Sequence, residues 1–437
     1  MDPLYISLIT IVLLLVMILL GMHVGLALAS LSLIGVWWIK GNFMIAITLL
    51  ATTSYQGLME YVYAVIPMFV LMGTLANRSG ASEELYDTAH ALLARVSGGL
   101  AMATVAANAV FAAITGVSVA SAAVFSKIAI PQMTRFGYDR KLSLGTVAAS
   151  SLLGMLIPPS LLFIVYGVLS EESIGKLFVA GIIPGVLLAV FLCAGIYVMV
   201  KIRPQLAGGA IGTSQKLPEM NLRLILKPWV FILLILIILG GIYAGFFTPT
   251  EAGAIGAFAT FVLCLLRGKI TAVSLWSVLL ETGYTTASVF LLLIAAQMYS
   301  RMLTYSGLPG QITDFVTSLA ISPHMVVVLF LLVFLALGAV LDSISIMLVT
   351  MPIMLPVIQA LGFDLIWFGI VAVVAMEIGF ITPPFGLVVF AMKASLGEEA
   401  TIEEIFWGAA PFLLIIFCLL ALLFFFPILS TYLPSLM

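Results

Sequence analysis

Long apolar runs, separated by short polar or glycine- and proline-containing stretches, dominate the chain. Examples are Leu4–Leu20, Trp229–Phe247 and Phe412–Leu429. Each is close to the roughly 20 apolar residues with which a helix crosses a bilayer. The runs lack the apolar–polar alternation of membrane β-barrel strands. The pattern therefore predicts an all-α polytopic protein embedded in a lipid bilayer.

Composition narrows the classes of function. Of the 437 residues, 63% are hydrophobic and 8% are charged, whereas a soluble domain has about 25% charged residues. The formal charge of −2 provides no basic surface for nucleic acid. The three histidines lie far apart, the three cysteines lack metal-ligand spacing, and no phosphate-binding P-loop occurs. We therefore expect no cofactor, no catalytic site and no direct coupling to ATP.

An internal repeat runs through the chain at an offset of 225 to 228 residues. Its landmarks keep the same order: Ser79-Gly80 with Ser306-Gly307, Gly137-Tyr138-Asp139 with Gly362-Phe363-Asp364, Pro158-Pro159 with Pro383-Pro384, Ile174 and Phe178 with Ile402 and Phe406, and Pro184 with Pro411. The offset predicts repeat one at 1–205 and repeat two at 228–437. Between them, 206–227 is predicted to be a polar, basic linker that faces the cytoplasm.

Each repeat contains paired apolar pieces that are too short to span a bilayer. Fourteen helical residues cover roughly 21 Å, less than the hydrocarbon core of about 30 Å. We therefore predict re-entrant helical hairpins at about 97–132 and 325–357. Lys and Arg flank only the first hairpin, so the two should enter from opposite faces, as in inverted-topology repeats. Scaffold spans are predicted at 1–60 and 228–281, with both termini periplasmic.

Helices are also predicted to break within the spans at about 142–168 and 366–395. Paired prolines remove backbone donors, and the carbonyls freed there favour a hard cation such as Na⁺, together with hydroxyls and a carboxylate. The predicted Na⁺ ligands lie at the hairpin tips and the proline pairs: Thr115, Gly116, Ser118, Ile157, Pro158, Asp342, Ser343, Thr382, Pro383 and Gly386.

Substrate residues are predicted beside the same breaks. Helix amino termini at the hairpin tips attract an anion without a buried cation, and the candidates are Ser121, Ser160, Ser345, Phe385 and Arg301. Arg301 has a second interpretation, snorkelling to the membrane interface. Asp342 has three: it coordinates an ion, carries a proton, or bonds backbone donors at the tip. Glu377 and Lys393 lie on the last broken helix and are not assigned to the site.

Several motifs together resemble the large membrane subunit of tripartite ATP-independent periplasmic (TRAP) transporters. They cover essentially the whole chain: Ala129-Ile130-Pro131, Phe136–Asp139, Leu156–Ser160, Tyr166-Gly167, Ser173–Phe178, Gly245–Glu251 and Glu377–Gly386. The first hairpin tip departs from the family's common Ser-Gly-Ser-Ser, since it reads Thr115-Gly116-Val117-Ser118. Val117 has no side-chain oxygen with which to bind an ion.

The resemblance implies an elevator-type secondary transporter of the ion-transporter superfamily, driven by a Na⁺ gradient in the bacterial inner membrane. It also implies two partners, a small four-helix membrane subunit and a periplasmic solute-binding protein, and a carboxylate substrate. The residues alone leave other functions open. These are a stand-alone carboxylate carrier of the same superfamily, a membrane-embedded enzyme and a channel.

Overall fold

The computed structural model describes residues 2–208, 227–319 and 321–437. Within these ranges the chain forms helices and no strand, which confirms the all-α class. Six of the described helices are long and apolar enough to cross a membrane, or seven if the bent pair Arg140–Leu156 and Leu161–Ser170 forms one span. The predicted linker lies largely outside the described residues, at 209–226.

Long helices cover the predicted scaffold segments 1–60 and 228–281 and continue beyond them to Arg78 and Ser306. In the first half they are α1 (Pro3–Leu19), α2 (Val24–Lys40), α3 (Phe43–Met59) and α4 (Val65–Arg78), with the short η1 (Tyr61–Ala64) before α4. In the second half they are α14 (Trp229–Tyr243), α15 (Pro249–Leu266) and α16 (Ala272–Ser306). The 35-residue α16 passes without a break through the region that corresponds to α3, η1 and α4.

Two helical hairpins and two broken helices make up the rest of the core. Hairpin one consists of α6 (Gly99–Thr115) and α7 (Ser118–Arg135), and hairpin two of α18 (Pro323–Gly338) and α19 (Ser343–Ala360). Break one, Ile157–Ser160, separates α8 (Arg140–Ser151) and α9 (Leu153–Leu156) from α10 (Leu161–Ser170). Break two, Phe380–Gly386, separates α20 (Leu365–Gly379) from α21 (Leu387–Leu396).

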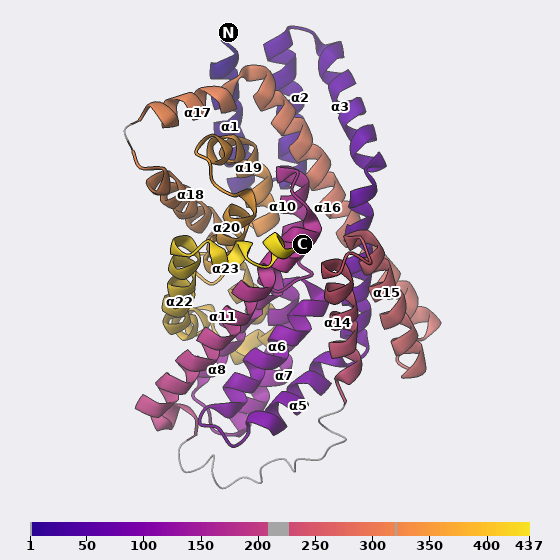
Figure 1. Cartoon of the computed structure of the whole chain (residues 1–437), viewed down its shortest axis with the longest axis vertical. Helices are drawn as coiled ribbons and strands as arrows, with labels where there is room; N and C mark the ends of the chain where they lie inside the picture. Colours follow the sequence, from indigo (N-terminus) through magenta and orange to yellow (C-terminus); the bar gives the residue numbers. More distant parts are fainter. Residues whose placement is uncertain (1, 209–226, 320) are drawn as a thin grey trace.

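Connecting helices complete the chain. They are α5 (Ala81–Leu93), α11 (Ile174–Ile202), η2 (Pro204–Leu206), α17 (Leu308–Ser318), η3 (Gly397–Glu399), α22 (Ile402–Phe425), α23 (Ile428–Thr431) and η4 (Pro434–Leu436). In Figure 1, α5–α8 and α14 lie in the lower half of the view, whereas α1–α3 and α17–α20 lie in the upper half. The hairpins of the two halves therefore approach each other at the centre of the molecule.

The repeated motif before each broken helix makes the same local structure in both halves. Gly137 and Gly362 have positive φ angles of 75° and 76°. Two residues later, the Asp139 carboxylate accepts from Leu142 N at 3.0 Å, and the Asp364 carboxylate accepts from Trp367 N at 2.8 Å. Each aspartate satisfies a free N–H at the start of its helix. The motif thus fixes where α8 and α20 begin; the opposite orientation of the two repeats in a membrane stays a prediction.

Candidate functional site

Hairpin one packs directly against break one through two glycines. Gly116, at the tip, has φ +64°, and a Cβ atom there would lie 2.5 Å from the Pro159 carbonyl oxygen. A Cβ on Gly154 of α9 would lie 2.8 Å from the backbone nitrogen of Ser118. Leu161 N donates to Gly116 O at 3.4 Å. Glycine is required at both positions because the two backbones touch.

Hairpin two meets break two in a similar way. A Cβ atom on Gly379 would lie 2.5 Å from Gly338 Cα, so α18 and α20 also touch backbone to backbone. Phe385 N donates to Ala339 O at 3.2 Å, which attaches break two to the tip. Gly154 and Gly379 occupy equivalent positions, 225 residues apart. Each hairpin is thus held close to its own broken helix.

One buried carboxylate joins the two hairpin tips. Glu377, on α20, is 2% exposed. Ser118 Oγ donates to its Oε2 atom at 2.5 Å, and Ser343 Oγ donates to its Oε1 atom at 3.2 Å. Ser118 and Ser343 are equivalent repeat positions and are both buried. Within the described residues no Lys or Arg forms an ion pair with Glu377. The two tips therefore share one buried carboxyl group, and no described Lys or Arg is paired with it.

Asp342 instead stabilises its own helix. It is the N-cap of α19, where one carboxylate oxygen accepts from Ser345 N at 2.9 Å and the other accepts from Ser345 Oγ. This geometry matches the interpretation that Asp342 bonds backbone donors at the tip. The carboxylate also lines a cavity, described below, so its negative charge faces open space as well.

Three other predicted hydroxyls bond carbonyls of their own segment. Thr115 Oγ1 donates to Phe111 O at 3.1 Å, Thr382 Oγ1 to Ile378 O at 2.7 Å, and Ser160 Oγ to Met155 O at 2.6 Å. A hydroxyl that donates in this way keeps lone pairs free for a cation. Ser121 is fully buried, and its Oγ has no hydrogen-bond partner among the described residues.

The two breaks differ in burial. Pro158, Pro159 and Ser160 of break one are buried, with Ile157 half-buried beside them. In break two, Pro383, Pro384 and Phe385 are exposed, although Gly386 is buried and starts α21. The predicted ion ligands thus lie in two groups, one beside the buried break one and one beside the exposed break two. Glu377 connects the two groups through its hydrogen bonds to Ser118 and Ser343. Among the described residues, no group of three or more His, Cys, Asp or Glu side chains is placed to hold a metal ion.

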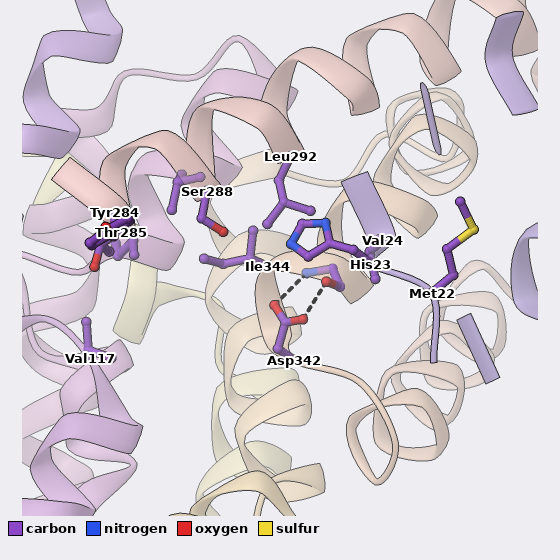
Figure 2. A pocket seen from close by; sticks show the side chains of 13 residues that line it. Met22, His23, Val24, Val117, Tyr284, Thr285, Ser288, Leu292, Asp342 and Ile344 are labelled. Carbon is purple, nitrogen blue, oxygen red and sulfur yellow. Dashed lines mark hydrogen bonds between the residues drawn. The ribbon is translucent and has the colours of Figure 1, made fainter. Parts of the chain in front are cut away.

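A cavity of about 600 Å³ lies between the hairpin tips and the scaffold. Val117, Asp342 and Ser345 line it from the tips. Scaffold residues line the other side: His23 from the turn between α1 and α2, and Tyr284, Thr285 and Ser288 from α16. Figure 2 shows the His23 imidazole, the Ser288 hydroxyl and the Asp342 carboxylate arranged around this space. The volume suits a small organic ligand.

Arg301 does not line the cavity. Its guanidinium donates to Thr53 Oγ1 at 3.0 Å and to Gln56 Oε1 at 2.8 Å, so it attaches α16 to α3. Ser121, Ser160 and Phe385 are likewise absent from the cavity wall, whereas Ser345 is part of it. The substrate assignments stay predictions.

Sequence reasoning left two parts of this arrangement unassigned. Glu377 is an acidic residue in an apolar span, and the cost of placing such a group in a membrane is a signal that applies to it as it does to Asp342. His23, Tyr284, Thr285 and Ser288 carry no such signal. They come together with the tips only because the scaffold packs beside hairpin two. No local sequence pattern predicts this packing.

Comparison with known proteins gives one consistent family. A protein-family model described as "Tripartite ATP-independent periplasmic transporter, DctM component" matches residues 11–429. The large permease protein DctM of a C4-dicarboxylate TRAP transporter from Pseudomonas aeruginosa is 36% identical, over 88% of this chain and 89% of that protein. The 2,3-diketo-L-gulonate large permease protein YiaN from Escherichia coli is 31% identical, over 93% and 95%.

A solved structure supports the fold independently. The YdaH transporter of Alcanivorax borkumensis has a TM-score of 0.61 at 16% identity, covering 87% of this chain and 88% of its own. At that identity the likeness concerns the fold alone. The relatives of higher identity are named as transporter permeases, so the protein is a membrane transporter component and not an enzyme. The chain belongs to the DctM family of large permease subunits of tripartite ATP-independent periplasmic transporters.

Proposed function

We propose that the chain is the large membrane subunit of a secondary transporter, located in the bacterial inner membrane, that uses a Na⁺ gradient to import a small organic acid. A periplasmic binding protein delivers the acid, and a small membrane subunit completes the complex. The hairpins and broken helices move together as an elevator relative to the scaffold segments. Family membership supports the general activity, and the site supports the coupling ion.

The observation that carries Na⁺ coupling is the position of Glu377 between the hairpin tips. Its carboxylate accepts hydrogen bonds from two serine hydroxyls, one from each hairpin. These hydroxyls, the carboxylate and the carbonyls at the breaks are all hard oxygen ligands, which suit Na⁺ and not a soft transition metal. A cation bound beside them neutralises the buried negative charge and holds the two hairpins in one arrangement.

The relatives support an acidic substrate and partner subunits. Their names include C4-dicarboxylate, 2,3-diketo-L-gulonate and sialic acid, which are all organic acids. The chain covers 59% of the sialic acid permease protein SiaT of Haemophilus influenzae and 62% of the isethionate permease protein DctMQ of Oleidesulfovibrio alaskensis. The remaining length of those proteins leaves room for a second membrane component, which this chain would obtain as a separate subunit.

Reconstitution into proteoliposomes tests the proposal. With the small subunit and the binding protein present, an inward Na⁺ gradient is expected to drive uptake of a radiolabelled organic acid. Omitting either partner, or replacing Na⁺ by K⁺ on both sides, is expected to abolish it. Uptake by this chain alone would establish a stand-alone carrier. Equal uptake in Na⁺ and K⁺ would overturn the assignment of the coupling ion.

A further inference from the structure

We propose that the cavity between the scaffold and hairpin two is the substrate site and takes a small, singly charged hydroxy acid, with the acid's carboxylate bound at His23. The inference rests on the proposed function and names the substrate class of the same site. Three features of the lining carry it: the position of the one imidazole among the described lining residues, the hydroxyls around it, and the balance of charge.

His23 lines the cavity from the start of α2. It occupies the N-cap position of α2, where its side chain makes no capping hydrogen bond. A Cβ atom on Gly25 would lie 3.4 Å from His23 Nδ1, so the imidazole rests against the bare backbone of α2. The side chain is exposed and lines the cavity opposite Asp342, and no ion pair joins these two described residues. An imidazole N–H is thus available to donate to a ligand carboxylate.

Hydroxyl groups supply the remaining polar contacts. Thr285 and Ser288 lie three residues apart on α16, a spacing that places both on one side of the helix, and Tyr284 lines the cavity next to them. Ser345 faces them from α19. Hydroxyls both donate and accept, and they therefore match the hydroxyls of a ligand better than a second carboxylate, which accepts only.

The charge around the cavity disfavours a second negative charge on the ligand. In the part of the chain that the structure describes, no Lys or Arg lines the cavity, and Arg301 is bonded to α3. Asp342 lines the cavity, and Glu281 lines a smaller cavity that shares Val117 and Thr285 with it. A second carboxylate on the ligand would lie near these acidic groups with no lining Lys or Arg to pair with it, and burying an unpaired charge is costly.

Direct binding to the purified complex of this chain and its small subunit tests the inference without requiring transport. Titration calorimetry in NaCl would compare three probes: glycerate, which has one carboxylate and two hydroxyls; propionate, which lacks the hydroxyls; and succinate, which has two carboxylates. Glycerate is expected to bind at least about tenfold more tightly than either other probe, because each of them leaves site groups unpaired or adds a charge.

Substitutions at one position then separate charge from shape. His23→Gln should weaken glycerate binding about tenfold or more, and His23→Arg, which adds a fixed cation, should raise succinate affinity toward that of glycerate. His90→Gln, a substitution on α5 outside the cavity, is the matched control and should change neither. Retention of the native melting temperature by each variant shows that it is folded.

The result that overturns the inference is wild-type binding of succinate as tight as that of glycerate, no binding of glycerate, or full glycerate affinity in His23→Gln. Its failure is distinguishable from failure of the proposed function. Na⁺-driven uptake that is indifferent to His23 would remove the inference alone. Binding that depends on His23, together with uptake that ignores Na⁺, would remove only the Na⁺ coupling.

Discussion

The two hairpin tips share a serine that bonds the same carboxyl group but differ at the residue before it. Ser118 and Ser343, at equivalent positions, both donate to Glu377. The residue before each serine is the N-cap of the second hairpin helix, Val117 in hairpin one and Asp342 in hairpin two. Asp342 caps its helix with its side chain, whereas Val117 makes no such bond. The shared serine bonds each tip to Glu377. The N-cap residue determines whether the tip also carries a side-chain carboxylate.

The two broken helices also differ, in how deeply their breaks are buried. Break one is buried, and the Pro159 carbonyl lies against Gly116 of the tip. Break two exposes both of its prolines. The tip without a capping oxygen is therefore supported by the more enclosed break, and the tip with a carboxylate by the more open one. Glu377 itself is unique to one half, since Leu152 occupies the equivalent position of repeat one.

Removing the charge that both tips share should have the largest effect. Glu377→Gln preserves size and hydrogen-bonding capacity but removes the negative charge. A unit charge within about 6 Å of a cation contributes ~3 kcal/mol at an effective dielectric constant of about 20, which is about 100-fold in affinity. We expect the Na⁺ concentration for half-maximal uptake to rise by about that factor in proteoliposomes.

A matched control separates this effect from general loss of fold. Glu398 lies exposed in η3, and Glu398→Gln should leave the Na⁺ dependence unchanged. Both variants should be compared for the amount of folded protein by gel filtration in detergent. A Glu377→Gln protein with native Na⁺ dependence would show that the two tips do not share a charge-dependent ion site.

The proline pairs test whether the closed and open breaks are equally important. Pro159→Ala changes a buried residue whose carbonyl touches the tip, whereas Pro384→Ala changes an exposed one. Destabilising substitutions typically cost about 0.5–3 kcal/mol, and the larger costs arise where a buried residue is changed. We expect initial uptake rates to fall about tenfold for Pro159→Ala and by less than about threefold for Pro384→Ala.

Equal losses in the two proline variants would contradict this ranking. They would show that the path of the backbone at each break matters more than its burial. No loss in either variant would remove the breaks from the mechanism. Rates should be normalised to the amount of each variant inserted in the vesicles, because a misfolded protein would otherwise imitate an inactive one.

Local sequence patterns predict much of the fold, but they predict only part of the candidate site. The length and polarity of the apolar runs suffice to predict helices, and the paired Asp139 and Asp364 motifs mark where two of them begin. The hydroxyl-bearing residues and prolines among the predicted ion ligands can likewise be recognised from the sequence, because they interrupt apolar runs. The partner of Ser118 is not, because Glu377 is 259 residues away and only packing brings the two together.

The cavity illustrates the same limit more strongly. Its walls come from the turn after α1, from α16 and from both hairpin tips. His23 stands in a short turn, where a histidine has no sequence pattern that predicts a ligand. The substrate candidates from sequence were therefore drawn from the breaks, where polar residues interrupt apolar runs. The scaffold side of the cavity cannot be predicted without knowing that α19 packs beside α16.

The smallest expected effect comes from making the two tips alike. Val117→Ser would give α7 a capping hydroxyl, and a serine N-cap is worth about 0.5–2 kcal/mol. We expect a higher melting temperature and a Na⁺ half-saturation that falls by up to about fivefold, since the ordered tip presents one more oxygen. Val119→Ser, two residues further along α7, adds the same hydroxyl where it cannot cap and should produce neither change. If both serines behave alike, the N-cap residue does not govern the difference between the tips, and the contrasting burial of the two breaks remains its cause.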